Sequence, residues 1–222
     1  MDELWEIAAS LIQGEAARVK DLTQAALDNG IAVDKVLNEG LLAGMAVVGE
    51  QFRKEEMFLP EVLFSARAMK AGMDLVEQLL ADSGVKPIGR IVIGTVKSDA
   101  HDIGKNLVSV MLKGAGFEVI DLGTDVSPEK FVDEIKEKEP PLVGLSAMLG
   151  TSIPYLKTTI NAIDVAGLRG QVKVLIGGAI VTQSHADSIG ADGYAPDAGS
   201  AVGKAKELLG INSSLPSSGD LL

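Results

Sequence analysis

The sequence contains no cysteine, and this absence removes several kinds of site at once. Disulfides, thiolate zinc sites and cysteine-ligated iron–sulfur clusters are excluded, and the absence fits a reducing compartment. No apolar run reaches the roughly 18 residues that a membrane span needs. Residues 1–5 also lack the basic start and apolar core of a signal peptide. We therefore expect a cytoplasmic protein without a membrane partner.

Basic residues are scarce as well. The chain has 20 lysines and arginines against 31 aspartates and glutamates, which gives a net charge of −11. A nucleic-acid partner is not expected, because proteins that bind nucleic acids usually present a basic stripe to the phosphates. Histidine is also rare, with only two in the chain, so a histidine in a structured loop is a distinctive feature.

The first part of the chain, residues 1–86, has the periodicity of helices. Apolar residues recur at helical spacing over 4–11, 17–27, 33–54 and 60–80. Four helices joined by short connections predict a small four-helix bundle.

From residue 87 to residue 212 the pattern changes to short apolar runs that alternate with helical segments. Strands that are apolar throughout and separated by helices indicate a parallel, doubly wound sheet. The size and order are those of a flavodoxin-like or Rossmann-like α/β domain with five strands. The final segment, 213–222, is rich in serine, proline and glycine and is expected to be a flexible tail. The expected strands are 91–96, 117–122, 142–147, 172–176 and 193–195, and the expected helices lie near 104–115, 128–138, 154–166 and 198–209.

The segment 99–104 reads Asp-Ala-His-Asp-Ile-Gly and follows the first expected strand. In an open α/β sheet, ligands bind just past the carboxyl ends of the strands. Asp99 stands two residues before His101 and can orient its imidazole, as carboxylates orient metal-bound histidines. This arrangement suggests a single protein ligand to a metal that brings its other ligands with it.

Three further loops should meet this one at the same sheet edge. They are the small and hydroxyl-rich segment 144–152, the pair Gly177-Gly178, and the segment 194–200. Glycines let a ligand approach the backbone closely. The loops lack the basic residues of a polyphosphate site, and no Gly-x-Gly-x-x-Gly follows the first strand. They predict an apolar-to-neutral slot that is open to a long ligand.

These loops together resemble the cobalamin-binding module, whose pattern is Asp-x-His-x-x-Gly, then Ser-x-Leu, then Gly-Gly. The matching segments here are 99–104, 146–148 and 177–178. The upstream segment 58–61, Phe-Leu-Pro-Glu, is similar to the helical cap that precedes this module in methionine synthase and in small corrinoid proteins of methyltransferase systems. The resemblance covers residues 1–210 and implies a cobalamin or corrinoid cofactor, such as methylcobalamin with its cobalt.

The resemblance also implies roles for individual residues. His101 would replace the nucleotide base as the lower axial ligand of cobalt, through its distal ring nitrogen, so that the cofactor is bound base-off. Asp99 would hold the other ring nitrogen, and Ser152 would complete a His–Asp–Ser relay. Phe58 would shield the upper face. The residues implied to bind the cofactor are Ser98, Asp99, Ala100, His101, Asp102, Ile103, Gly104, Ser146, Met148, Gly150, Gly177, Gly178, Ala198 and Phe58.

Two positions depart from the family pattern, and some side chains keep a second interpretation. Gly150 stands where relatives usually place threonine, and Met148 where they usually place leucine, which is close to it in volume. Asp102 is either a helix N-cap or a polar neighbour of the corrin. Ser152 can cap a helix as well as serve the relay, and Phe58 can be part of the bundle core.

The function implied is that of a methyl carrier in one-carbon metabolism. Such a protein takes a methyl group from a substrate-specific methyltransferase and passes it to an acceptor-side methyltransferase, with a reductase for reactivation. The chain has no room for a substrate-binding barrel, so it reads as a carrier subunit rather than a complete enzyme. The alternatives are a cobalamin-dependent sensor, the small subunit of an adenosylcobalamin mutase, or a flavodoxin-like nucleotide-binding module. The sequence does not name the methyl donor, which could be methanol, a methylamine, a betaine or an aryl methyl ether.

Overall fold

The computed structural model describes residues 3–83 and 86–211, in two compact units. The first unit holds the helices that precede Pro87, and the second holds the strands and helices that follow Ile88. The expected tail, 213–222, lies outside the described residues. Among the described helices, none combines the length and the apolar composition that crossing a membrane requires.

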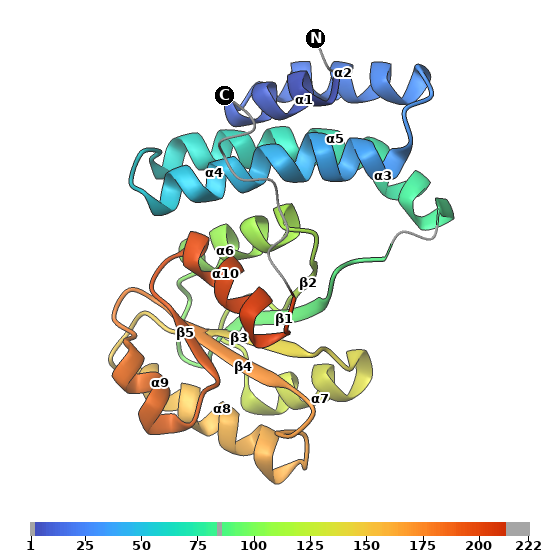
Figure 1. Cartoon of the computed structure of the whole chain (residues 1–222). Helices are drawn as coiled ribbons and strands as arrows, with labels where there is room; N and C mark the ends of the chain where they lie inside the picture. The colour runs from blue at the N-terminus through green and yellow to red at the C-terminus, as the bar shows by residue number, and fades with distance from the viewer. Residues whose placement is uncertain (1–2, 84–85, 212–222) are drawn as a thin grey trace. The chain divides into compact units, whose positions relative to one another are not determined.

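The first unit is a helical bundle, as the periodicity predicted. Its core includes the fully buried side chains of Ile7, Leu11, Leu41 and Met45. Because these residues recur at helical spacing, each helix buries one apolar stripe against the others. Its elements are α1 (Glu3–Ile12), α2 (Ala16–Asp28), α3 (Val33–Lys35), the π-helical segment η1 (Val36–Leu42), α4 (Ala43–Arg53) and α5 (Leu59–Ser83) (Figure 1).

The expected third helix, 33–54, is one continuous run that contains a π-helical segment in its first half. Two glycines allow α1 to pack closely against this run. A Cβ added to Gly40 would lie 3.2 Å from the side chain of Ile7, and one added to Gly44 would lie 2.9 Å from the carbonyl oxygen of Ala8. The apolar pattern alone does not report such a change in helical winding.

The second unit is a five-stranded sheet in which every pairing is parallel, with the order β2-β1-β3-β4-β5. This is the flavodoxin-like order, so the predicted fold class is confirmed. The short helix α9 was not predicted as a separate element. The elements are β1 (Arg90–Thr95), α6 (Ile103–Gly114), β2 (Glu118–Asp121), α7 (Pro128–Lys138), β3 (Leu142–Ser146), α8 (Ile153–Val165), β4 (Lys173–Gly177), α9 (Gln183–Ile189), β5 (Gly193–Ala195) and α10 (Ala198–Leu208).

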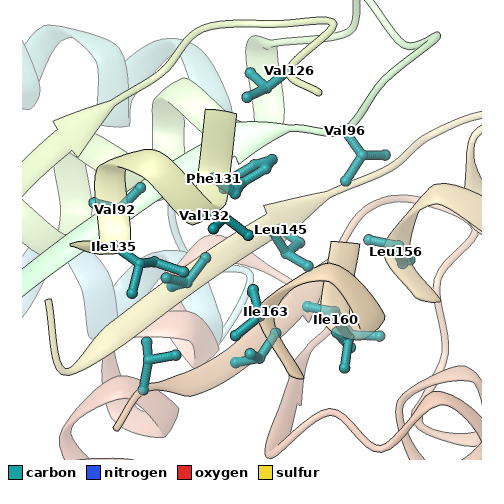
Figure 2. Packing of buried hydrophobic residues seen from close by; sticks show 14 of the residues in the cluster. Val92, Val96, Val126, Phe131, Val132, Ile135, Leu145, Leu156, Ile160 and Ile163 are labelled. Atoms are coloured by element: carbon teal, nitrogen blue, oxygen red, sulfur yellow. The ribbon is translucent and has the colours of Figure 1, made fainter. Parts of the chain in front are cut away.

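Helices cover both faces of the sheet, with α6 and α10 on one face and α7, α8 and α9 on the other (Figure 1). Figure 2 shows the core under α7 and α8, where side chains of both helices meet those of β1 and β3. Phe131 is fully buried there, and a Cβ added to Gly94 of β1 would lie 2.8 Å from its ring. Packing on both faces explains why the strands are apolar throughout.

Helix capping fixes where several of these helices begin. Ser127 caps α7 by accepting a hydrogen bond from the N–H of Lys130 at 3.3 Å, and Asp197 caps α10 through Ser200 at 2.8 Å. The helix α9 begins with a capping box in which Thr182 and His185 bond to each other's backbone N–H. His185, the second histidine, therefore has a structural role at this helix start.

Candidate functional site

The loop between β1 and α6 carries both residues at the centre of the predicted site. Ser98 has a φ of 66°, in the left-handed region that few side chains adopt. The next residue, Asp99, is 1 % exposed. The side chain of His101, two residues further on, is 47 % exposed. The loop thus buries the carboxylate and presents the imidazole at the carboxyl end of the sheet.

The carboxylate of Asp99 is held by donors from two loops. Its Oδ1 accepts from the N–H of His101 at 3.0 Å and lies 2.7 Å from Nδ1 of the same residue. Its Oδ2 accepts from the hydroxyl of Ser152 at 2.6 Å, and from the N–H groups of Met148 at 2.7 Å and Leu149 at 3.3 Å. Three residues that lie about 50 positions from Asp99 in the sequence therefore join one hydrogen-bonded group with it.

These contacts decide the charge of Asp99. Burial raises its pKa, but the hydrogen bonds from Ser152, Met148 and His101 lower it by more, so the pKa lies well below its usual range. An ionised carboxylate only accepts hydrogen bonds, so Nδ1 of His101 must carry the proton. In the neutral imidazole the other ring nitrogen, Nε2, then presents a lone pair, as a metal-binding imidazole must.

Ser152 and Asp102 each precede a helix, but neither side chain caps it. The buried hydroxyl of Ser152 contacts Asp99 and the carbonyl of Leu149 at 2.8 Å, and α8 has no side-chain cap. The carboxylate of Asp102 accepts from the side-chain amide of Asn106 at 3.0 Å, rather than from a backbone N–H at the start of α6. The relay contact of Ser152 is therefore present, and the capping interpretation of both residues is wrong.

The ends of β3 and β4 meet backbone to backbone. Ser146 pairs with Gly177 in the sheet, and the N–H of Ala147 donates to the carbonyl of Gly177 at 3.1 Å. Gly178 has a φ of 135°, and an added Cβ would lie 1.8 Å from the carbonyl oxygen of Ala147. Only glycine fits at this position, so the two loops approach without a side chain between them.

The surroundings of His101 fit a large, flat and mostly apolar ligand. A Cβ added to Gly104 or to Gly150 would meet no atom within 4 Å, so the backbone is open at both positions. Ile103 is 70 % exposed and Met148 is 43 % exposed, although both are apolar. Open backbone and exposed apolar side chains beside an oriented imidazole are what a metal-containing macrocycle would need.

The remaining predicted residues lie in different places. Ser98 and Ala100 are exposed in the same loop as His101, whereas Ala198 is buried as the first residue of α10. Phe58 belongs to the first unit and is 69 % exposed, so the interpretation as bundle core is wrong. Its N–H donates to the carboxylate of Glu61 at 2.7 Å, just before α5.

Two residues that hold the loop were not predicted from the sequence. The hydroxyl of Thr95, which is fully buried, donates to the carbonyl of His101 at 2.9 Å. A carboxylate oxygen of Asp125 accepts from the N–H of Ser98 at 2.7 Å. A polar residue at the end of a buried strand was a signal for Thr95. Nothing in the sequence pointed to Asp125, which lies in the loop after β2.

Comparisons with known proteins show the family of this chain. The B12 binding domain family matches residues 89–203, and a second B12 binding domain family matches residues 4–77. The chain is 42 % identical over 206 residues to dimethylamine corrinoid protein 3 of Methanosarcina acetivorans, covering 93 % of this chain and 96 % of that protein. The chain belongs to the B12-binding corrinoid protein family. Trimethylamine corrinoid protein 2 of Methanosarcina mazei is 40 % identical over 204 residues, 91 % of this chain and 94 % of that one.

Solved structures of corrinoid proteins share the fold over nearly the whole chain. The methanol:cobalamin methyltransferase complex MtaBC from Methanosarcina barkeri matches with a TM-score of 0.84 and 29 % identity, covering 95 % of this chain and 81 % of that one. A cobalamin-binding protein from Desulfitobacterium hafniense matches with a TM-score of 0.77 and 30 % identity, covering 92 % and 98 %. This corrinoid protein therefore takes a cobalamin-type cofactor and serves as a methyl carrier of a methyltransferase system.

Proposed function

We propose that this corrinoid protein shuttles a methyl group between two methyltransferases and binds its cofactor base-off, with Nε2 of His101 as the lower axial ligand. The observation that supports this most strongly is the contact between Asp99 and Nδ1 of His101 at 2.7 Å. It fixes the tautomer that leaves Nε2 free. The carboxylate itself is held from the β3–α8 loop by Ser152 and Met148.

When bound, the corrinoid supplies a cobalt centre that accepts and releases the methyl group. The protein's part is to bind, to orient and to tune. Asp99 keeps the proton on Nδ1 of His101 and fixes the ring plane, as carboxylates do for other metal-bound histidines. Ser152 donates to Asp99, which keeps this carboxylate ionised and correctly placed. The ring orientation is therefore set by a network rather than by a single contact.

The neighbouring backbone would accommodate the rest of the cofactor. Gly104 and Gly150 offer open backbone beside the imidazole. Gly178 allows a close approach to the end of β3, and Gly177 allows one to β5. Ser146 lies at that junction, as the last residue of β3. We propose that these positions form the slot for the displaced nucleotide tail, with Ala198 at its β5 side, and that Phe58 shields the upper face.

The proposed partners follow from the relatives. Two of them are named dimethylamine and trimethylamine corrinoid proteins, and MtaBC is a methanol:cobalamin methyltransferase complex. We propose that this protein likewise docks on a methyltransferase that supplies methyl groups from a small methylated substrate. A second methyltransferase would take the methyl group, and a reductase would reactivate oxidised cofactor.

Isotope labelling of histidine tests the axial ligand directly. The protein is produced with 15N-histidine, loaded with cobalamin and reduced to the cobalt(II) form for electron paramagnetic resonance. An axial histidine nitrogen should split each cobalt line into a doublet, whereas the cofactor's own 14N base would give a triplet. His101→Ala should abolish the doublet, and His185→Ala, which removes the other histidine, should retain it. A triplet in the wild-type protein, or a doublet that persists in His101→Ala, would overturn the proposal.

A further inference from the structure

Asp125 lies in the loop after β2 and contacts the backbone of the histidine loop at two points. One of its carboxylate oxygens, Oδ1, accepts from the N–H of Ser98 at 2.7 Å. Its own N–H donates to the carbonyl of Asp99 at 2.9 Å. Both contacts are made to the residues that lead directly to His101. The β2–α7 loop is thus attached to the loop that presents the imidazole.

The contact to Ser98 holds a backbone conformation that serine does not prefer. The φ of Ser98 is 66°, and a non-glycine residue in this region stays there only when its surroundings stabilise it. The left-handed residue turns the chain so that Asp99 points inward and His101 outward. If Ser98 relaxed to a negative φ, the carboxylate and the imidazole would both move from their present positions.

The other end of the same loop is fixed separately. Thr95, the last residue of β1, donates its hydroxyl to the carbonyl of His101 at 2.9 Å. The loop that carries Asp125 is itself anchored, because Val126 donates to the carbonyl of Thr95 at 3.0 Å and Thr95 donates to the carbonyl of Gly123 at 3.0 Å. Asp125 therefore extends from an anchored segment, and its exposed carboxylate is placed to accept from the Ser98 N–H.

We infer that Asp125 is a positioning residue for His101: it acts through Ser98 and Asp99 and sets the direction in which the axial imidazole points. This inference rests on the proposed role of His101 as the lower ligand. Asp125 does not touch the imidazole, so it contributes no chemistry of its own. Its contribution is to reduce the set of conformations that the loop samples, which lowers the entropy cost of forming the axial bond.

Three variants separate this positioning from general effects on folding. Asp125→Gly removes the acceptor but tolerates the left-handed φ of 53° at this position. Asp125→Asn keeps an acceptor oxygen and also tolerates that conformation. Glu139→Gly is the matched control, because Glu139 is another acidic residue with a left-handed φ, 46°, at the end of α7. It precedes the amino end of β3, at the opposite edge of the sheet from His101.

The first measurement is the 15N-histidine doublet of the cobalt(II) protein, together with the dissociation constant for cobalamin. Asp125→Gly should lower the ratio of histidine-ligated to unligated cofactor by about fivefold to tenfold and weaken cobalamin binding by the same factor. This is the effect of losing one hydrogen bond of ordinary strength at an exposed position. Asp125→Asn and Glu139→Gly should stay within about twofold of wild type. A full doublet and unchanged affinity in Asp125→Gly would overturn the inference.

The second measurement uses the apoprotein and does not depend on the axial bond. Hydrogen exchange at the N–H groups of His101 and Met148, which donate to Asp99, should be about fivefold to tenfold faster in Asp125→Gly and unchanged in the other two variants. If the wild type shows no histidine doublet but the exchange rates behave in this way, the proposed ligation is wrong and the positioning of the loop stands. Exchange that is unchanged in Asp125→Gly overturns the positioning.

Discussion

Asp99→Asn is the substitution that tests the centre of the site most directly. The carboxylate faces five donors: the N–H and Nδ1 of His101 on one oxygen, and the groups of Met148, Leu149 and Ser152 on the other. Asparagine has the same shape, but its NH2 must replace one of these oxygens. Whichever side it takes, at least one backbone N–H loses its acceptor inside a buried site.

The stability that Asp99→Asn loses follows from these contacts. The side facing His101 is the less damaging place for the NH2, because the imidazole can move its proton from Nδ1 to Nε2 and accept. The N–H of His101 is then left without an acceptor, which costs about 1–3 kcal/mol, and the remaining donors lose a charged acceptor. We expect a total loss of about 3 kcal/mol, or about 10 °C in the melting temperature. The same tautomer change places a proton on Nε2 and removes its lone pair.

The chain has spectroscopic probes that separate its two units. Its only tryptophan, Trp5, lies in α1 of the first unit, and its only tyrosines, Tyr155 and Tyr194, lie in the second. Urea unfolding of the apoprotein is followed by tryptophan fluorescence for the first unit and tyrosine near-ultraviolet signals for the second. Asp99→Asn should shift the tyrosine transition to lower urea and leave the tryptophan transition in place.

Asp187→Asn provides the matched control for this experiment. Asp187 is an exposed aspartate of α9 that accepts one hydrogen bond from Gln183, so its replacement should change stability by no more than about 0.5 kcal/mol. If Asp99→Asn unfolds at the same urea concentration as wild type, the buried network around Asp99 does not stabilise the second unit, which would refute the expected loss of about 3 kcal/mol. Retention of the 15N-histidine doublet in this variant would equally refute the tautomer argument.

Two further predictions concern glycines at the sheet edge. Gly178→Ala should destabilise the second unit by more than about 3 kcal/mol, since its Cβ would lie 1.8 Å from the carbonyl oxygen of Ala147. The control is Gly190→Ala, which is also at a positive φ but has open space around it. In the same urea titration this control should lose only about 1 kcal/mol of stability. Gly150→Val should leave the stability of the apoprotein within about 0.5 kcal/mol of wild type. It should weaken cobalamin binding at least tenfold in a titration followed by absorbance. Unchanged binding would show that Gly150 does not face the cofactor.

The elements that could be predicted from the sequence are those whose buried apolar residues recur at a regular spacing. The strands of the second unit were found because both faces are covered, and the flavodoxin-like order followed from their alternation with helices. The π-helical segment over Val36–Leu42 was not predicted, because the apolar spacing does not report which hydrogen-bond spacing a helix uses. The helix α9 was missed because it has only seven residues, too few for a clear apolar period.

At the site, the motif located His101 and Asp99 but not the residues that hold them. The roles of Ser152 and Asp102 could not be read from position alone, since a serine or aspartate before a helix usually caps it. Their hydrogen bonds go instead to Asp99 and Asn106. Asp125 was missed for a related reason: it is 27 positions from Ser98, and only the pairing of β1 with β2 brings the two loops together.

The Asp99 network also limits how this binding motif could be moved to another protein. His101 and the carboxylate that orients it, Asp99, lie only two residues apart, which suggests a segment that could be grafted onto any flavodoxin-like scaffold. The carboxylate, however, takes three of its hydrogen bonds from the β3–α8 loop. A designer who copies only the segment 99–104 would obtain a histidine with no defined orientation. A working graft must transfer the ends of two strands together.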